Sequence, residues 1–300
     1  MLSFVHLEAL IAIAELGSFR AAAERLGVTQ PTVSMRIREL EHSLDTRLFD
    51  RSTYRPQLTA DGREILRYAQ RMMVLMRDMR ACALNGVGLG GTIRLGAADT
   101  FALTCLPALL ARLEHRFPRL KVALDIDYSF NLNRKLHRGD LDIAFLTSPT
   151  AGPDVRIEPL VPIALVWVAS PRLGLPESRL APADLEDLPI ITNPEPSNLY
   201  STAIDWFGRA GLAPARLNSC NSLTYMVRLA AAGVGVSLLP SAILHPEVES
   251  GVLRILETEP PIAPHDMAIA VRCAPTSPDL SPVQEIAREI VARSELAVAP

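Results

Sequence analysis

Hydrophobic residues recur every three or four positions near the start of the chain and predict three short helices. The first is expected over residues 6–16, where apolar side chains share one helix face. The second is expected to begin after Ser18, a suitable N-cap, and to end at Gly27, where the chain can turn sharply. Thr29 is the expected cap of the third helix, and Pro31 falls in its first turn. Two short helices joined by a glycine-containing turn predict a helix-turn-helix.

The third helix has two faces of different chemistry. Its buried stripe is expected at Val33, Ile37, Leu40 and Leu44. The opposite face holds Pro31, Met35, Arg38 and His42, with Ser34 and Arg36 on its flanks. An outer face with arginines and hydrogen-bonding groups suits the DNA major groove. Because Glu39 and Glu41 lower the positive charge of this helix, the solvated face of an ordinary three-helix bundle stays open as an alternative.

Two strand-like segments follow and bracket a short loop. Residues 47–51 and 56–58 are expected to pair as a hairpin, or wing. Arg51 and Arg55 lie where a wing could contact DNA phosphates.

A long helix is predicted from residue 60 to about residue 84. Its apolar residues alternate between spacings of three and four, which is typical of a coiled-coil seam. The seam consists of Ile65, Tyr68, Met72, Leu75, Met79 and Cys82. The seam predicts pairing with a second copy of the chain, and a long helix packed only on its own domain is the alternative.

Strand and helix signals alternate after a glycine-rich joint at residues 85–91, and predict βαβ units on mainly parallel sheets. A second series starts near residue 163, and the last strand and helix are expected to return to the first lobe. We therefore expect an α+β chain with a winged helix-turn-helix domain (1–59), a linker helix and joint (60–86) and a two-lobed α/β domain (87–300). Lobe I would take about 87–162 and 268–300, and lobe II about 163–267. A cleft between two such lobes suits a small molecule.

Composition supports a folded protein with a polyanion partner at its N-terminal end. The chain has 300 residues, of which 49% are hydrophobic and 21% charged, and a net charge of −3, which allows a sizeable core and excludes a disordered chain. Residues 1–86 contain 12 basic and 10 acidic side chains and the rest 18 and 23, so the positive excess lies with the helix-turn-helix. No apolar run approaches the roughly 20 residues of a membrane span, and we expect a soluble, cytoplasmic protein without membrane contact.

At this point the sequence resembles the LysR-type transcriptional regulators over essentially its whole length. Residues 17–59, GSFRAAAERLGVTQPTVSMRIRELEHSLDTRLFDRSTYRPQLT, are similar to the family's winged-helix signature. LPALLARLEHRFPRLKVAL, GDLDIAFL and LAAAGVGVSLLP are similar to parts of its periplasmic-binding-protein-like effector domain. The resemblance implies a non-enzymatic homo-oligomer, commonly a dimer of dimers, that binds double-stranded promoter DNA and a small-molecule effector. RNA polymerase is a further candidate partner.

Carried over by position, the family's DNA-reading residues are Ser18, Thr29, Gln30, Pro31, Thr32, Ser34, Met35, Arg36 and Arg38, with Arg51 and Arg55 in the wing. One departure stands out, because many relatives have arginine directly after the motif's serine, whereas Met35 follows Ser34 here. We expect this change to shift the base preference at that step from guanine toward a thymine methyl contact.

The resemblance also places an effector pocket after the first two strands of lobe I. Those positions hold Asp99, Thr100, Phe101, Ser129, Phe130 and Asn131, and weaker candidates at strand ends and helix starts are Thr147, Asn193, Ser197 and Ser222. Helix starts suit small carboxylates, but a carboxylate at position 99 would repel them. Asp99 therefore has two open roles. It could select an effector that carries an amine or another donor group, or it could cap a helix.

Two other classes of protein share a two-lobed architecture, namely solute-binding proteins and enzymes with a nucleotide fold. We find no export signal, no phosphate loop and no nucleophile motif, and the helix-turn-helix favours a regulator. The six histidines lack metal-site spacing, and Cys82, Cys105, Cys220 and Cys273 lie far apart in the sequence. We therefore expect no metal, no cofactor, no disulfide and no oxidation sensing.

Overall fold

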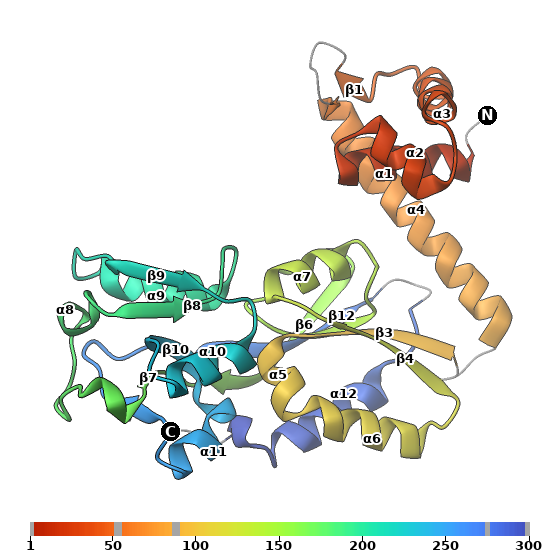
Figure 1. Ribbon diagram of the computed structural model, residues 1–300. Coiled ribbons are helices and arrows are strands. Elements are labelled where there is room, and N and C mark those ends of the chain that lie inside the picture. Colours follow the sequence, from red (N-terminus) through yellow and green to blue (C-terminus); the bar gives the residue numbers. More distant parts are fainter. Residues whose placement is uncertain (1–2, 51–55, 86–90, 274–276, 298–300) are drawn as a thin grey trace. The chain divides into compact units, whose positions relative to one another are not determined.

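The computed structural model describes residues 3–50, 56–85, 91–273 and 277–297 (Figure 1). The chain divides into two compact units, Met1–Gly86 and Val87–Pro300, here called unit 1 and unit 2. Each unit has its own hydrophobic core. Within the described residues, no helix combines the length and the apolar character that a membrane crossing needs.

Unit 1 is a three-helix bundle followed by a small hairpin and a long helix. Its elements are α1 (Phe4–Leu16), α2 (Phe19–Leu26), α3 (Gln30–Ser43), β1 (Phe49–Asp50), β2 (Gln57–Leu58) and α4 (Ala60–Asn85). The three predicted short helices are confirmed, because their apolar faces converge on one core. Gly27 has a φ of 65°, which glycine adopts at little cost and which turns the chain from α2 into α3.

The first wing strand begins later than predicted. The segment was expected to start at residue 47, whereas β1 starts at Phe49, and β1 and β2 pair over two residues each. The backbone N–H groups of Leu48 and Phe49 donate to the Glu41 carboxylate at 2.8 and 3.3 Å, so the chain before β1 bonds to α3 and not to a second strand. Gly62 allows α4 to start close to this segment. A Cβ at position 62 would lie 2.1 Å from the Leu48 carbonyl oxygen.

Unit 2 contains two five-stranded sheets, one in each lobe. The lobe I sheet has the order β4-β3-β5-β12-β6, and the lobe II sheet has the order β11-β7-β10-β8-β9. The strands of lobe I are β3 (Gly91–Ala97), β4 (Leu120–Ile126), β5 (Ile143–Thr147), β6 (Val155–Ile163) and β12 (His265–Arg272). Those of lobe II are β7 (Leu165–Ala169), β8 (Pro189–Thr192), β9 (Arg216–Ser219), β10 (Val236–Pro240) and β11 (Arg254–Leu256).

Helices cover both sheets (Figure 1). Lobe I has α5 (Asp99–Thr104), α6 (Leu106–Arg116), α7 (Ser129–His137) and α12 (Ser281–Val291), and lobe II has α8 (Pro182–Leu185), α9 (Asn198–Gly208), α10 (Leu223–Ala231) and α11 (His245–Glu249). Short 3-10 turns occur at Pro171–Leu173, Ser241–Ile243 and Glu295–Ala297. The predicted fold class, a winged helix-turn-helix followed by a two-lobed α/β domain, is confirmed.

The two sheets are mixed, and the prediction of mainly parallel sheets is wrong in this respect. β12 runs antiparallel to both β5 and β6, and β7 runs antiparallel to both β10 and β11. The parallel pairs are β4-β3-β5 in lobe I and β10-β8-β9 in lobe II. The antiparallel strands are those by which the chain crosses between the lobes, and a crossing strand enters the second sheet in the opposite direction.

Strand β6 has no counterpart in the predicted elements. It contains Pro159 and Pro162, and prolines argue against a strand in a sheet interior. The structure resolves this conflict by placing β6 at the edge of the lobe I sheet, where one side of the strand needs no partner. β9 is also an unpredicted edge strand, and all four of its residues are exposed.

Four helices begin at the carboxyl ends of parallel strands. α5 follows β3, α7 follows β4, α9 follows β8 and α10 follows β9. In open α/β sheets this is the edge at which ligands bind. A buried ion pair between Arg94 and Asp142 fixes the start of β5 against β3, with the Arg94 Nε 3.0 Å from the Asp142 carboxylate.

Candidate functional site

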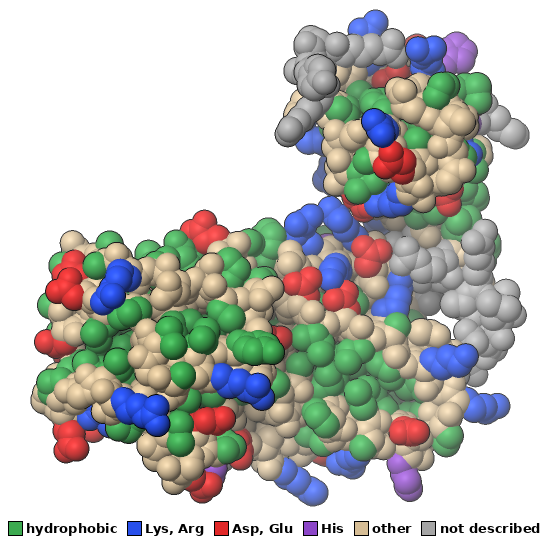
Figure 2. All heavy atoms as spheres, viewed as in Figure 1, with side chains coloured by type: hydrophobic (Ala, Val, Ile, Leu, Met, Phe, Trp, Pro, Cys, Tyr) green, Lys and Arg blue, Asp and Glu red, His purple; other side chains and the backbone are tan. Residues whose placement is uncertain are grey.

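The exposed side of α3 carries the residues predicted to read DNA. Gln30, Met35 and Arg38 are exposed, and Val33 and Ile37 on the opposite side are buried, as the hydrophobic spacing predicts. Pro31 and His42 are also exposed, and Thr32, Ser34 and Arg36 are half-buried. Figure 2 shows basic and hydrophobic side chains together at this end of unit 1. Contact of these residues with DNA stays a prediction.

Three of the predicted DNA-reading residues have a local structural role. The Ser18 hydroxyl accepts from the backbone N–H of Ala21 at 3.4 Å and caps α2. The Thr29 hydroxyl accepts from the backbone N–H of Thr32 and caps α3. The hydroxyl oxygens of these two threonines lie 2.8 Å apart. These contacts set where each helix begins, and so help to orient the outer face of α3.

Glu41 does not belong to the outer face of α3, contrary to the interpretation that its charge dilutes that face. It is only 8% exposed, and its carboxylate accepts the two backbone N–H groups that precede the wing. Glu39 is exposed, but its carboxylate lies 2.9 Å from the His6 ring of α1. Arg36 and Arg38 have no ion-pair partner among the described residues, so both guanidinium groups are available to an external anion. Arg51 and Arg55 of the predicted wing lie outside the described residues.

The predicted seam on α4 is exposed along most of its length. Tyr68 is 55% exposed, Leu75 45% and Met79 63%, and Met72 is exposed as well. Ile65 differs, because it is half-buried against the unit 1 core together with Leu66, Ala69 and Met73. One face of α4 therefore packs on its own unit and the neighbouring face stays open. The side chain of Cys82 lies outside the described part of the chain.

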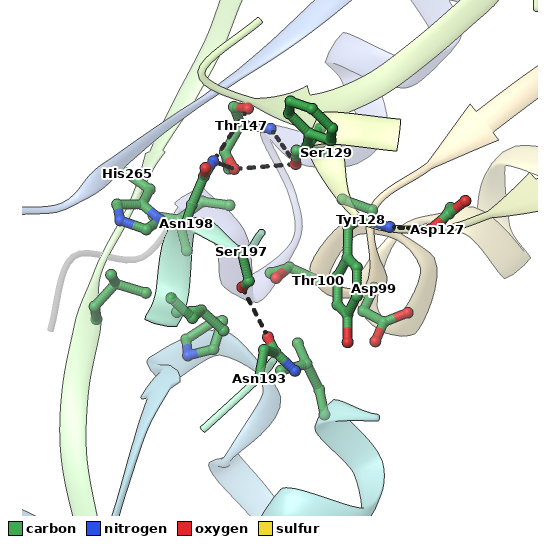
Figure 3. Close-up of a pocket in the computed structure, with 17 residues that line it drawn as sticks. Asp99, Thr100, Asp127, Tyr128, Ser129, Thr147, Asn193, Ser197, Asn198 and His265 are labelled. Atoms are coloured by element: carbon green, nitrogen blue, oxygen red, sulfur yellow. Dashed lines mark hydrogen bonds between the residues drawn. The ribbon is translucent and has the colours of Figure 1, made fainter. Parts of the chain in front are cut away.

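Unit 2 contains a cavity between the two lobes, at the edge where α5, α7, α9 and α10 begin (Figure 3). Its volume is about 60 Å³. The lining residues come from both lobes, and they are Ala98, Asp99, Thr100, Asp127, Tyr128, Ser129, Phe130, Thr147, Ile163, Leu165, Asn193, Ser197, Asn198, Leu199, Leu223, Pro240 and His265.

Hydrogen bonds cross from one lobe to the other at this cavity. The amide of Asn198 at the start of α9 donates to the Thr147 hydroxyl at the end of β5, at 2.9 Å. The Thr202 hydroxyl of α9 lies 2.7 Å from the ring nitrogen of His265 on β12. The carboxylate of Asp99 at the start of α5 also faces the backbone N–H of Leu223, the first residue of α10, which lowers the pKa of Asp99. The arrangement of the two lobes is therefore stabilised by polar contacts at the cavity itself.

The cavity is polar on both walls. The Ser129 hydroxyl accepts from the backbone N–H of Thr147 at 3.0 Å, and the Ser197 hydroxyl donates to the Asn193 amide oxygen at 3.3 Å. Asn193 is buried, and its amide nitrogen donates to the Cys220 carbonyl at 2.9 Å. These bonds fix the side-chain orientations around the cavity, which is what a selective small-molecule site requires.

Two carboxylates at the cavity, Asp99 and Asp127, have pKa values that are shifted in opposite directions. Burial raises the pKa of Asp99 above its ordinary value, and the nearby charge of Asp127 adds to this effect although the Leu223 N–H opposes it. Burial also raises the pKa of Asp127, but hydrogen bonds from Asn131, Lys135 and the Tyr128 N–H outweigh it and the net shift is downward.

Burial lowers the pKa of His265, whose ring nitrogen lies 2.7 Å from the Thr202 hydroxyl, so the imidazole is neutral at pH 7. Burial and then the charges of Asp99, Cys220 and Asp127 raise the pKa of Tyr128. Its hydroxyl oxygen is buried and has no hydrogen-bond partner among the described residues.

The structure brings most of the predicted effector residues together. Asp99, Thr100, Ser129, Phe130, Thr147, Asn193 and Ser197 line the cavity. Phe101, Asn131 and Ser222 do not line it. Phe101 is fully buried and stacks on Phe145 with ring centroids 4.0 Å apart, Asn131 donates to the Asp127 carboxylate at 2.8 Å, and Ser222 precedes α10.

The structure contradicts the interpretation that Asp99 caps a helix. Asp99 is the first residue of α5 and makes no side-chain cap for that helix. Its carboxylate instead faces the start of α10 in the other lobe.

Sequence reasoning missed several lining residues, most importantly Asp127, Tyr128, Asn198 and His265. Asp127 and Tyr128 directly precede the predicted Ser129, so the strand-to-helix junction was a usable signal for both. Asn198 is likewise adjacent to Ser197. No comparable signal marks His265, because it starts the crossing strand β12 and is far away in the sequence. Within the described residues, no group of three or more His, Cys, Asp or Glu side chains is placed so that it could hold a metal ion.

Comparison with known proteins gives matches over nearly the whole chain. The family described as "Bacterial regulatory helix-turn-helix protein, lysR family" matches residues 4–63, and "LysR substrate binding domain" matches residues 86–293. A probable hydrogen peroxide-inducible genes activator of Mycobacterium leprae is 31% identical over 271 residues, which cover 89% of this chain and 87% of the relative. The SDS degradation transcriptional activation protein of a Pseudomonas species is 29% identical over 287 residues, or 94% and 92% of the two chains.

Solved structures share the fold. ArgP from Mycobacterium tuberculosis has a TM-score of 0.68 and 21% identity, over 97% of this chain and 98% of the other. A full-length OxyR variant from Pseudomonas aeruginosa has a TM-score of 0.63 and 23% identity, over 99% and 97%. CbnR in complex with its target DNA has a TM-score of 0.57 and 23% identity, over 97% and 99%.

Proposed function

Because this chain belongs to the LysR family, DNA-binding transcriptional regulators with an effector-binding domain, we propose that α3 reads its operator and that the interlobe cavity binds its effector. The observation that carries the proposal is that the two units present different binding features, a basic helix surface in unit 1 and a polar cavity in unit 2. Unit 1 presents Arg38 on the outer face of α3 and Arg36 on its flank, neither with an ion-pair partner among the described residues, and unit 2 encloses a polar cavity between its lobes. The match of residues 4–63 to a helix-turn-helix family rejects the alternative of a solute-binding protein without DNA function.

On this proposal the outer side of α3 lies in the major groove. Arg36 and Arg38 supply hydrogen bonds to guanine or to phosphate, and Met35, which is 51% exposed, offers an apolar contact to a thymine methyl group. Gln30 and Ser34 stand on the same side of the helix and can bond to base edges or phosphates. Arg51 and Arg55 in the wing are assigned to phosphates on the strength of their positions in the sequence.

We also assign the exposed seam of α4 to pairing with a second copy of the chain. Tyr68, Met72, Leu75 and Met79 form an apolar strip that a partner helix would cover. Unit 2 offers further apolar surface, since Leu103 on α5 and Tyr225 on α10 are 48% and 60% exposed and hydrophobic side chains gather over both helices (Figure 2). Two helix-turn-helix modules joined in this way would read half-sites about one helical turn, or a multiple of it, apart.

Effector binding acts in this proposal through the contacts between the lobes. A ligand that bonds to both walls of the cavity stabilises the closed arrangement, which the Asn198–Thr147 and Thr202–His265 contacts already favour. Such a shift biases one oligomer arrangement over another and changes the spacing of the DNA-reading helices. We place the protein in the cytoplasm, where promoter DNA is available.

The peroxide response named for one group of relatives is not part of the proposal. A thiol switch needs an accessible thiolate close to a second cysteine. Of the three described cysteines, Cys105 is buried, Cys220 is half-buried and Cys273 is exposed, and none lines the cavity or forms a disulfide.

The test begins with selection of operator sequences from random DNA by the full-length protein, followed by binding titrations at several salt concentrations. Arg38→Ala should weaken binding to the selected operator by about 1–3 kcal/mol. Arg67→Ala is the matched control, because Arg67 is also an exposed arginine but belongs to α4 and not to the helix-turn-helix. Equal losses in the two variants, or no selected sequence at all, would contradict the assignment of α3.

A further inference from the structure

The cavity between the lobes has an unbalanced charge. Asp99, Asp127 and His265 are its ionisable members besides Tyr128, and none of the residues that line it is Lys or Arg. Burial keeps His265 neutral at pH 7. The wall of the cavity therefore presents carboxylates, and no cationic side chain lines it.

The nearest lysine cannot neutralise this wall. Lys135 on α7 lies 2.9 Å from the Asp127 carboxylate, but it also lies 2.8 Å from both oxygens of Asp125. One positive charge thus serves two carboxylates, and Asp99 adds a third. Taken together, Asp99, Asp125, Asp127 and Lys135 carry a net charge of −2.

Asp99 also occupies a place that a ligand anion would otherwise take. The start of a helix attracts anions because its N–H groups point outward and its dipole is positive there. At α10 the Asp99 carboxylate faces the Leu223 N–H, which lowers the pKa of Asp99, and the N-cap residue Ser222 makes no side-chain cap of its own. A carboxylate of this chain therefore already lies at that helix terminus.

A second polar group next to Asp99 has no partner. Figure 3 shows the Tyr128 hydroxyl beside the Asp99 carboxylate, both directed toward lobe II. The hydroxyl oxygen is buried and makes no hydrogen bond within the described residues. A buried hydroxyl without a partner is costly, so a bound molecule that bonds to it stabilises the site. Its oxygen accepts a hydrogen bond from a donor that also reaches Asp99.

We propose that the effector of this regulator presents a cationic group, an ammonium or a guanidinium, to Asp99 and Tyr128 on the lobe I wall of the cavity. This inference rests on the proposed function of the cavity and names the chemical class of its ligand. Hydrogen bonds between ions are about twice as strong as those between neutral groups, and Asp99 has a free oxygen lone pair for one. The same contact would tie the ligand to the residue of α5 that faces the start of α10.

The experiment uses three small molecules that differ only in their end groups. Succinate, 4-aminobutyrate and 1,4-diaminobutane have the same four-carbon length and carry no, one and two ammonium groups. Binding to the full-length protein at pH 8 is measured by calorimetry and thermal shift. We expect diaminobutane and 4-aminobutyrate to bind at least tenfold more tightly than succinate.

Asp99→Asn is the decisive variant, because asparagine keeps the size of the side chain and an acceptor oxygen while the charge is lost. We expect it to lower the affinity for diaminobutane at least tenfold and to reduce the preference over succinate. Glu177→Gln, which removes an exposed carboxylate outside the cavity, should leave all three affinities unchanged.

Tighter binding of succinate than of diaminobutane overturns the proposal, as does binding of none of the three, or an unchanged ranking in Asp99→Asn. Failure of the proposed function has a different signature. If diaminobutane binds in an Asp99-dependent way but leaves operator binding unchanged, the ligand class stands and the effector role of the cavity fails.

Discussion

Replacement of Glu41 tests how strongly the recognition helix depends on one buried carboxylate. Glu41 lies on α3, and its Oε1 accepts from the backbone N–H of Leu48 at 2.8 Å and of Phe49 at 3.3 Å. In Glu41→Ala both N–H groups lose this acceptor in a buried environment. An unsatisfied buried donor costs about 1–3 kcal/mol, so two of them cost about 2–6 kcal/mol.

This loss is large for unit 1. At about 0.05–0.15 kcal/mol per residue, a unit of this size has a free energy of unfolding of about 4–13 kcal/mol. Glu41→Ala therefore brings unit 1 near its unfolding threshold, and DNA binding should weaken in proportion to the unfolded fraction. Glu41→Gln keeps an acceptor oxygen and loses only the charge, so we expect a smaller loss of about 1–2 kcal/mol.

Urea unfolding of the full-length protein separates the two units. Trp167 and Trp206 are the two tryptophans of the chain and both belong to unit 2, so their fluorescence follows unit 2 alone. Far-UV circular dichroism follows the helices of both units. We expect Glu41→Ala to shift part of the dichroism change to lower urea and to leave the fluorescence midpoint in place.

The matched control for Glu41 is Glu24→Ala on α2, whose carboxylate makes an exposed ion pair with Arg20 and should contribute under about 1 kcal/mol. If Glu41→Ala unfolds like Glu24→Ala, or if Glu41→Gln is as damaging as Glu41→Ala, the structural role given to this carboxylate is wrong.

Four further outcomes are expected. Because burial raises the pKa of Asp99, its ionisation destabilises the folded state as pH rises above the ordinary pKa of aspartate, and Asp99→Asn should have a higher Tm than the wild type at pH 8 with a gap that narrows as pH falls toward that ordinary pKa; a gap independent of pH contradicts this. Gly62→Ala places a Cβ 2.1 Å from a backbone oxygen and should cost about 1–3 kcal/mol in urea unfolding, whereas Gly208→Ala, with open space around it, should be neutral or stabilising. In operator selection, Met35→Arg should favour guanine over thymine at one position by about 1–3 kcal/mol, and an unchanged operator would exclude the methyl contact. Met79→Lys should shift sedimentation toward the single chain at micromolar protein if the α4 seam pairs two copies.

Local signals predicted unit 1 well, because its helices carry their own start and stop residues. Ser18 and Thr29 cap the helices for which they were expected, and Gly27 makes the turn. The sequence could not show that Glu41 points inward. A charged residue next to the buried Leu40 is usually solvated, and the two N–H groups that hold Glu41 come from a segment seven and eight residues later.

Prediction in unit 2 succeeded for helix starts and failed for long-range pairing. Asp99, Ser129 and Ser197 follow strands, and strand ends can be found in the sequence. The nearness of Asp99 to Leu223 could not be found in this way, since Leu223 lies in the other lobe. β6 was missed because its prolines are compatible with a strand only at a sheet edge, and the edge position depends on where β12 inserts.

The position of β12 has a consequence for how the protein is made. This strand lies between β5 and β6 inside the lobe I sheet, yet it is the last strand to leave the ribosome. Residues 1–86 can fold early during synthesis, whereas lobe I cannot close its sheet until residue 272 has emerged. A nascent or prematurely terminated chain would thus carry a finished DNA-binding unit attached to an unfinished sensor.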